Sequence, residues 1–178
     1  MSCRLTLLIV ANRVRLMKRI ALALLATVLS ISLVSPADAA VKTVKGGLGQ
    51  SLSATQTQVK SGDFVTVSGT NFDETVGIYL GFCVVPKTGA TPTPCGGGVN
   101  KAGTGEASFW ISSNPPPYGV GLAEEFLPGG RFIKKLKISK MIGRYNCTKV
   151  RCAITVRADH LRSGDRSYDL FIPITVKK

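Results

Sequence analysis

The residues whose types and spacing could do chemistry in this 178-residue chain are first of all its five cysteines. Cys147 and Cys152 are separated by four residues, close enough to bridge a tight hairpin where one strand turns into the next. Two free buried cysteines would be the alternative in a cytosolic protein. Cys3 lies in the leader described below, so an exported chain would keep four cysteines, an even number that indicates two disulfides.

Three connectivities are open for the four remaining cysteines. Proximity in the sequence favours Cys83–Cys95 and Cys147–Cys152. Each bridge closes a short loop, so each is expected to contribute about 2–3 kcal/mol in the loop-entropy model. Oxidation of both pairs would also remove thiol nucleophiles and zinc ligands from the chain.

The other residues that commonly carry catalysis form no recognisable constellation. His160 is the only histidine and has no second imidazole with which to share a metal or a proton relay, so we interpret it as a surface loop residue. Glu124 and Glu125 are adjacent and would face opposite sides of a strand, which suggests no acid–base pair. The sequence contains no G-x-S-x-G motif and no phosphate-binding loop. We therefore expect a non-enzymatic protein without a cofactor or a metal site.

The first 39 residues are typical of a secretory signal peptide. A basic start at Met17-Lys18-Arg19 precedes an apolar run over 20–34, which is too short for a comfortable membrane span, and 37–39 form an A-x-A cleavage site. Translation is expected to start at Met17, and an uncleaved N-terminal anchor is the alternative. Cleavage leaves 139 residues, enough for one domain with a core of its own.

Positive charge is concentrated in one part of the mature chain. Without the five basic residues and one acidic residue of the leader, 18 basic and 9 acidic residues remain, a net charge of +9. Residues 131–151 hold eight of the basic residues and none of the acidic ones. This predicted basic face is either a solvated strand edge guarded by lysines or a contact for an anionic polymer of the cell envelope or nucleic acid. Its members are Arg131, Lys134, Lys135, Lys137, Lys140 and Arg144.

Alternation of apolar and polar residues predicts an all-β fold. From Val150 to Ala158 every second residue is apolar, which indicates a strand with one buried face. After a flexible lead-in over 40–50, similar short segments are predicted at 51–58, 64–69, 75–85, 107–111, 131–140 and 170–176. Pro173 cannot donate to a ladder, so the last segment is predicted to be an edge strand. Seven or eight short strands joined by turns favour a β-sandwich in a single domain over 51–178.

The order of these features resembles the neocarzinostatin family, which consists of secreted actinobacterial apoproteins that carry enediyne chromophores. The similarity covers about residues 51–176 and rests on five segments: 65–69 with Asn71-Phe72, 79–83, 105–107, Cys147-x4-Cys152 and 170–174. The resemblance implies an immunoglobulin-like sandwich of seven antiparallel strands with the two disulfides favoured above. It also implies a ligand cleft between the sandwich and a two-stranded ribbon.

Three departures separate the chain from this family. Eleven residues lie between Cys83 and Cys95, which makes this loop longer than the family's. Val85 takes a position where the family's best-known member has an aromatic residue that lines the cleft. The region 114–140 is longer and more basic.

Two functions follow as hypotheses. The first is a secreted, extracellular binding protein that carries an apolar small molecule, such as an antibiotic chromophore directed at DNA, in the cleft. The second is a structural or interaction module of the cell envelope that uses its basic ribbon. Phe109 and Trp110 are neighbours on a predicted strand, so one of them faces outward and could line the cleft. The cleft candidates are Tyr79, Val85, Trp110, Tyr118 and Tyr145.

The leader assignment predicts the mature N-terminus. Edman sequencing of protein from the culture medium should read Ala-Val-Lys-Thr-Val, beginning at Ala40. A membrane-bound species that retains Lys18 and Arg19 would contradict cleavage and show an anchor instead.

Overall fold

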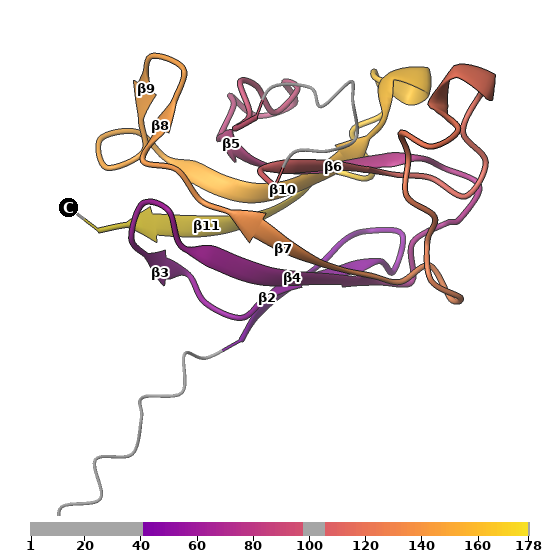
Figure 1. Ribbon diagram of the computed structural model, residues 1–178, viewed down its shortest axis with the longest axis horizontal. Coiled ribbons are helices and arrows are strands. Elements are labelled where there is room, and N and C mark those ends of the chain that lie inside the picture. The colour runs from indigo at the N-terminus through magenta and orange to yellow at the C-terminus, as the bar shows by residue number, and fades with distance from the viewer. Residues whose placement is uncertain (1–40, 98–105, 178) are drawn as a thin grey trace, which may run out of the picture. The chain divides into compact units, whose positions relative to one another are not determined.

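Two β-sheets pack face to face in the computed structural model, which describes residues 41–97 and 106–177. The predicted signal peptide, 1–39, lies outside these residues. Two short 3-10 helices, η1 (Pro117–Gly119) and η2 (His160–Arg162), lie together at one end of the upper sheet in Figure 1. A two-stranded ribbon of β8 (Met141–Ile142) and β9 (Tyr145–Asn146) lies at the other end. The chain is an all-β sandwich, which confirms the predicted fold class.

The first sheet contains four antiparallel strands in the order β1–β2–β4–β7. They are β1 (Lys42–Lys45), β2 (Ser51–Ala54), β4 (Phe64–Thr70) and β7 (Phe132–Lys137). Gly69 of β4 is paired with Phe132 of β7, and a Cβ atom at Gly69 would lie 2.1 Å from the Phe132 ring. The absence of a side chain at Gly69 therefore makes the room that this ring occupies.

The second sheet contains five strands in the order β3–β11–β10–β5–β6. They are β3 (Gln58–Val59), β5 (Ile78–Val84), β6 (Ser108–Ile111), β10 (Cys152–Ala158) and β11 (Leu170–Val176). All pairs are antiparallel except β3 with β11, which is parallel and joins only the last two residues of β11. Pro173 lies in the part of β11 that β3 does not reach, so its missing N–H interrupts no ladder on that side.

The described strands depart from the predicted seven at the start of the chain. The segment predicted as one strand over 51–58 divides into β2 and β3, which belong to different sheets. The crossing occurs at 55–57, where the Thr55 N–H donates to Thr66 of the first sheet and the Thr57 carbonyl accepts from Thr175 of the second. The two sheets thus hold nine strands within the described residues.

In place of the flexible lead-in predicted over 40–50, the structure has a strand and an anchored turn. β1 pairs with β2 from Lys42 to Lys45, and Val44 packs against the core. The following turn ends at Gln50, which is buried and donates from its side-chain amide to the Ser167 carbonyl at 3.1 Å. Three glycines in this segment suggested flexibility, but the buried side-chain amide of Gln50 and the pairing of β1 with β2 hold it in place.

β10 is the centre of the second sheet, and the prediction that only one of its faces is buried is wrong. Ile154 and Val156 face the first sheet and are fully buried, as the alternation predicted. Ala153 and Thr155, on the opposite face, are also buried. Thr155 donates to the Cys83 sulfur beside the Cys83–Cys95 disulfide, and Ala153 is paired with Cys83.

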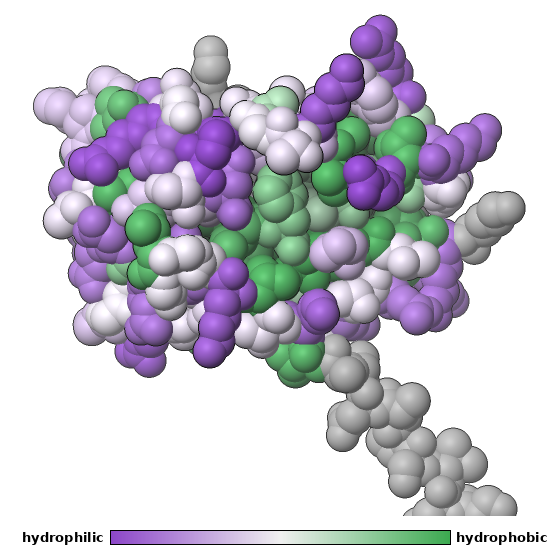
Figure 2. Space-filling view, turned by 180° about the vertical axis from the view of Figure 1, so that it is seen from behind, coloured by the Kyte–Doolittle hydropathy of each residue, from purple (hydrophilic) through white to green (hydrophobic). Residues whose placement is uncertain are grey.

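Apolar side chains also reach the surface. Figure 2 shows hydrophobic residues gathered across the middle of one face of the molecule, with hydrophilic residues around them. Exposed examples include Phe64, Ile133 and Val150. Individual exposed apolar residues are normal in folded domains, so a binding site has to be argued from a hollow and the groups that line it.

The alternation along β7 predicts a large difference between neighbouring positions. Leu136 is fully buried against the core and Lys135 is exposed. Leu136→Ala should lower the free energy of unfolding in urea by about 2–5 kcal/mol, because it leaves a cavity. Lys135→Ala should change it by less than about 0.5 kcal/mol. Similar losses for both variants would contradict the register of this strand.

Candidate ligand-binding site

The outer face of the second sheet brings together side chains from three strands. Register places Tyr79 of β5 between Trp110 of β6 and Arg157 of β10. One row further along, Gly81 lies between Ser108 and Thr155. These side chains point away from the sandwich core because they alternate with the buried residues of each strand. Gly81, without a side chain, leaves a depression in the middle of this surface.

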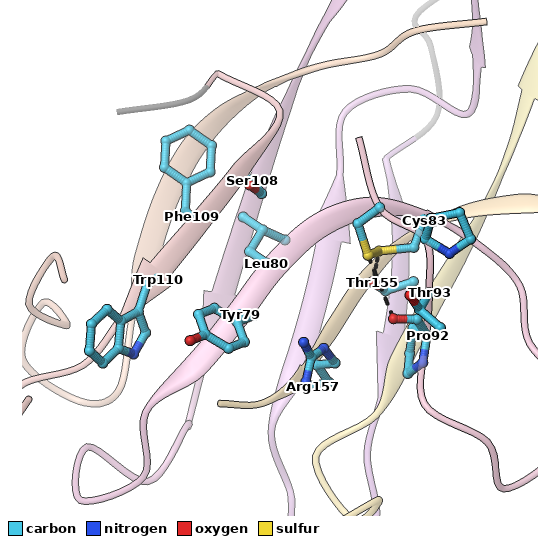
Figure 3. Close-up of a pocket in the computed structure, with 12 residues that line it drawn as sticks. Tyr79, Leu80, Cys83, Pro92, Thr93, Ser108, Phe109, Trp110, Thr155 and Arg157 are labelled. Carbon is cyan, nitrogen blue, oxygen red and sulfur yellow. Dashed lines mark hydrogen bonds between the residues drawn. A yellow bond between two sulfur atoms is a disulfide. The ribbon is translucent and has the colours of Figure 1, made fainter. Parts of the chain in front are cut away.

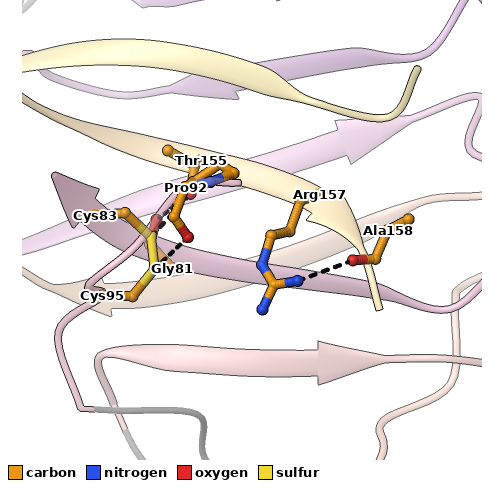
Figure 4. The surroundings of a disulfide bond; sticks show 7 residues. All are labelled: Gly81, Cys83, Pro92, Cys95, Thr155, Arg157 and Ala158. Atoms are coloured by element: carbon orange, nitrogen blue, oxygen red, sulfur yellow. Dashed lines mark hydrogen bonds between the residues drawn. A yellow bond between two sulfur atoms is a disulfide. The ribbon is translucent and has the colours of Figure 1, made fainter. Parts of the chain in front are cut away.

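The Cys83–Cys95 disulfide forms one wall of the depression (Figure 4). It ties the loop after β5 back onto that strand, where the Val84 N–H donates to Pro94 and the Gly96 N–H donates to Phe82. Both disulfides have the predicted pairing, since Cys147 is bonded to Cys152 as well. These are the two pairs that proximity in the sequence favoured among three possible connectivities.

The resulting pocket has a volume of about 160 Å³ (Figure 3). The Tyr79 and Trp110 rings, prolines, the disulfide and a few polar groups form its walls, and its lining residues are Tyr79, Leu80, Cys83, Pro92, Thr93, Pro94, Cys95, Ser108, Phe109, Trp110, Thr155 and Arg157. The space is close to that of a cavity of ~150 Å³ that holds benzene, and smaller than the ~300–1,000 Å³ typical of drug-sized ligands. It therefore suits a single ring better than a large chromophore.

Three of the five predicted cleft residues gather at one end of this site. Tyr79 and Trp110 line the pocket. Tyr118, in η1, is linked to Tyr79 by His160, which is hydrogen-bonded to both tyrosines. The His160 Nδ1 is 2.5 Å from the Tyr79 hydroxyl, and its Nε2 is 2.6 Å from the Tyr118 hydroxyl. A neutral imidazole has one donor and one acceptor nitrogen, so it can donate to one tyrosine and accept from the other. His160 is exposed, as predicted, but it also connects η1, η2 and β5.

Asp159 fixes the tryptophan. Its carboxylate is buried and accepts from the Trp110 indole N–H at 3.0 Å and from the Leu161 backbone N–H at 3.0 Å, which caps η2. A Cβ atom at Gly77 would lie 2.1 Å from this carboxylate, so the strand can approach it only with glycine here. Burial, together with the Asp159 charge, raises the pKa of Tyr79, which keeps its phenol protonated and able to donate.

The other two predicted cleft residues lie elsewhere. Val85 lines a second hollow of about 340 Å³ between the Cys147–Cys152 hairpin and β11, where Phe171 is the one aromatic residue of the lining. Tyr145 belongs to β9 and packs under Arg144, whose guanidinium lies 5.5 Å from the ring centre. No residue of β8 or β9 lines the aromatic pocket, so the expected site between the sandwich and a ribbon is not where the aromatic residues meet.

The six residues of the predicted basic face do not share one face. Lys134 points to the opposite side of β7 from Lys135 and Lys137, is half-buried over the Phe109 ring, and forms an ion pair with Glu124. Grouping it with Lys135 was wrong, because the two are adjacent on a strand. Lys137 is paired with Glu106, Arg131 donates to the Pro128 carbonyl, and Arg144 is at the turn of the ribbon. All six except Lys134 are exposed.

Among 41–97 and 106–177, no three His, Cys, Asp or Glu side chains are grouped so that they could hold a metal ion. In the same ranges, no helix has the length and apolar character that a membrane crossing requires.

Comparison with known proteins gives a structural likeness only. No protein-family model matches the chain, and no curated protein does. The solved structure of macromomycin is similar, with a TM-score of 0.48 and 17% sequence identity over 72% of this chain and 100% of the macromomycin chain. A likeness at this level concerns the fold alone, so the function has to be argued from the pocket.

Asp169 at the start of β11, next to this surface, should make stability depend on pH. Burial outweighs the attraction of Arg166 and raises the pKa of Asp169 from 3.8 to about 6. Between these values the folded protein binds more protons than the unfolded chain, so this group's contribution to stability is lost as the pH rises through that window. Urea unfolding of Asp169→Asn should therefore show a smaller loss, or a larger gain, of stability from pH 4 to pH 6.5 than the wild type.

Asp165→Asn is the control for this measurement. Hydrogen bonds from Ser167 lower the pKa of Asp165, so its contribution has the opposite sign and is lost as the pH falls. Parallel pH profiles for the wild type and Asp169→Asn would contradict the raised pKa.

Proposed function

We propose that this protein is a secreted, non-enzymatic binding protein that holds an apolar, ring-shaped small molecule in the pocket on the outer face of the second sheet. The observation that carries the proposal is a hollow with walls that are aromatic and already fixed. The Trp110 indole is hydrogen-bonded to Asp159, Tyr79 is bonded to His160, and the opposite wall is clamped by the Cys83–Cys95 disulfide. A preformed site of this kind loses little conformational freedom on binding.

A binding role agrees with the chemistry of the groups around the pocket. Both ring nitrogens of His160 are engaged with tyrosine hydroxyls, and the carboxylate of Asp159 is engaged with Trp110 and Leu161. The sulfurs in the wall are oxidised and cannot act as thiolate nucleophiles. These groups shape the pocket and are not free for acid–base or nucleophilic work. Two disulfides also agree with an oxidising, extracellular location.

A carrier related to the neocarzinostatin family is the finer form of this proposal. The small volume argues that one ring of a larger molecule would enter the pocket while the rest stays against the surface. The alternative role, contact with an anionic polymer, has less support because the six basic residues do not share a face.

Trp110 is the only tryptophan, so its single indole N–H resonance reports directly on the pocket. Benzamide, a neutral one-ring probe, should shift this resonance in a saturable titration. Gly81→Val should weaken binding by about tenfold or more, because an added side chain between Ser108 and Thr155 fills the hollow. A Cβ atom at Gly81 meets its nearest neighbour at 3.5 Å, an ordinary van der Waals contact, so the strand itself has room for a side chain there.

Gly47→Val is the matched control, since a Cβ atom at Gly47 has no atom within 4 Å and the residue is distant in sequence from the pocket strands. Its affinity for benzamide should equal that of the wild type. An indole resonance that never responds to benzamide, or equal affinities for the Gly81→Val and Gly47→Val variants, would refute the proposed site.

A further inference from the structure

Arg157 places a positive charge inside a pocket that is otherwise largely apolar. The residue lies on β10, the central strand, and its side chain emerges between Tyr79 and the loop at Pro92 and Thr93 (Figure 3). Its guanidinium lies 4.9 Å from the centre of the Tyr79 ring, and the side chain is half-buried. Stacking on the tyrosine orients the plane of the guanidinium and leaves its edge available for hydrogen bonds.

The hydrogen-bonding capacity of this arginine is largely unused within the described residues. A guanidinium has five N–H donors, and in this part of the chain Arg157 makes one long bond of 3.4 Å, from Nη1 to the Ala158 carbonyl (Figure 4). In the same residues it forms no ion pair. Its positive charge is therefore held on the pocket wall without a carboxylate in contact.

Two carboxylates, Asp159 and Asp169, lie near Arg157, and each of them binds another group. Asp159 accepts from the Trp110 indole and from the Leu161 N–H. Asp169 accepts from Arg166 at 3.1 Å. One oxygen of Asp169 is buried without a hydrogen-bond partner, but neither aspartate forms an ion pair with Arg157, so the guanidinium has no charged partner in contact among the described residues.

We propose that the pocket selects aromatic carboxylic acids, with Arg157 as the residue that anchors the carboxylate. The ring would pack against Tyr79 and Trp110, and the carboxylate would accept two parallel hydrogen bonds from the guanidinium edge. A volume of about 160 Å³ has room for one ring that carries one such group. An anionic ligand supplies the interactions that partial burial removes from the arginine, whereas a neutral ring does not. This inference rests on the binding function proposed above and specifies its ligand class.

Benzoate and benzamide test the proposal because they have nearly the same shape and differ in charge. Both are titrated into the purified mature protein at low salt, with the Trp110 indole resonance as the readout. The wild type should bind benzoate about tenfold more tightly than benzamide or better, as expected for a hydrogen-bonded charge pair. In Arg157→Gln, the benzoate-to-benzamide affinity ratio should fall to about one. Arg157→Lys keeps the positive charge but loses the planar guanidinium that donates two parallel hydrogen bonds, so an intermediate affinity ratio is expected.

Arg144→Gln is the control for non-specific attraction, because Arg144 lies at the ribbon turn and does not line the pocket. Its affinity ratio should equal that of the wild type. Equal affinities of the wild type for benzoate and benzamide, or an unchanged affinity ratio in Arg157→Gln, would overturn the proposed selection of carboxylates. In either case, binding of benzamide would still support the general binding function. A failure of both probes to bind would overturn the binding function itself.

Discussion

The pairing of β10 with both β5 and β11 is the constraint on which the other features depend. β10 matches β5 over seven residues, from Cys152 with Val84 to Ala158 with Ile78, and matches β11 over five. Because side chains alternate along a strand, this one register assigns every residue of three strands to the core or to the outer surface. It places Ile154 and Val156 in the core and, on the other face, Thr155 and Arg157 in the wall of the pocket.

A central strand that is buried on both faces needs something to cover its outer face. At one end of β10, the Cys83–Cys95 disulfide holds a proline-containing loop beside Thr155, and Ala153 is paired with Cys83. At the other end, η1 and η2 are connected to the sheet through His160 and Asp159. The pocket is the space between these two covers. Its shape is therefore fixed by one covalent bond on one side and by a small hydrogen-bonded network on the other.

The same alternation explains how the charges are distributed. Eight basic residues within 131–151 suggest one positive surface, yet neighbours on a strand point to opposite sides. Lys134 turns toward Phe109 and Glu124, whereas Lys135 turns to solvent. The number of basic residues in a segment of the sequence therefore overstates the charge on any one face of the structure. A single half-buried arginine in a pocket can be more informative about a ligand than several solvated lysines, because its electrostatic interactions are less screened.

Local patterns in the sequence determined the class of the fold, most of the strands and both disulfides. The period of two along 150–158 and the short separations within Cys83–Cys95 and Cys147–Cys152 are properties of neighbouring residues, so they can be read without a structure. The tertiary structure decided which side chains meet. Tyr79 and His160 are 81 residues apart and Tyr118 and His160 are 42 apart, and nothing local brings them together. Likewise, Val85 and Tyr145 are separated from the pocket, and Arg157 is placed inside it, by strand pairing and loop packing between distant parts of the chain.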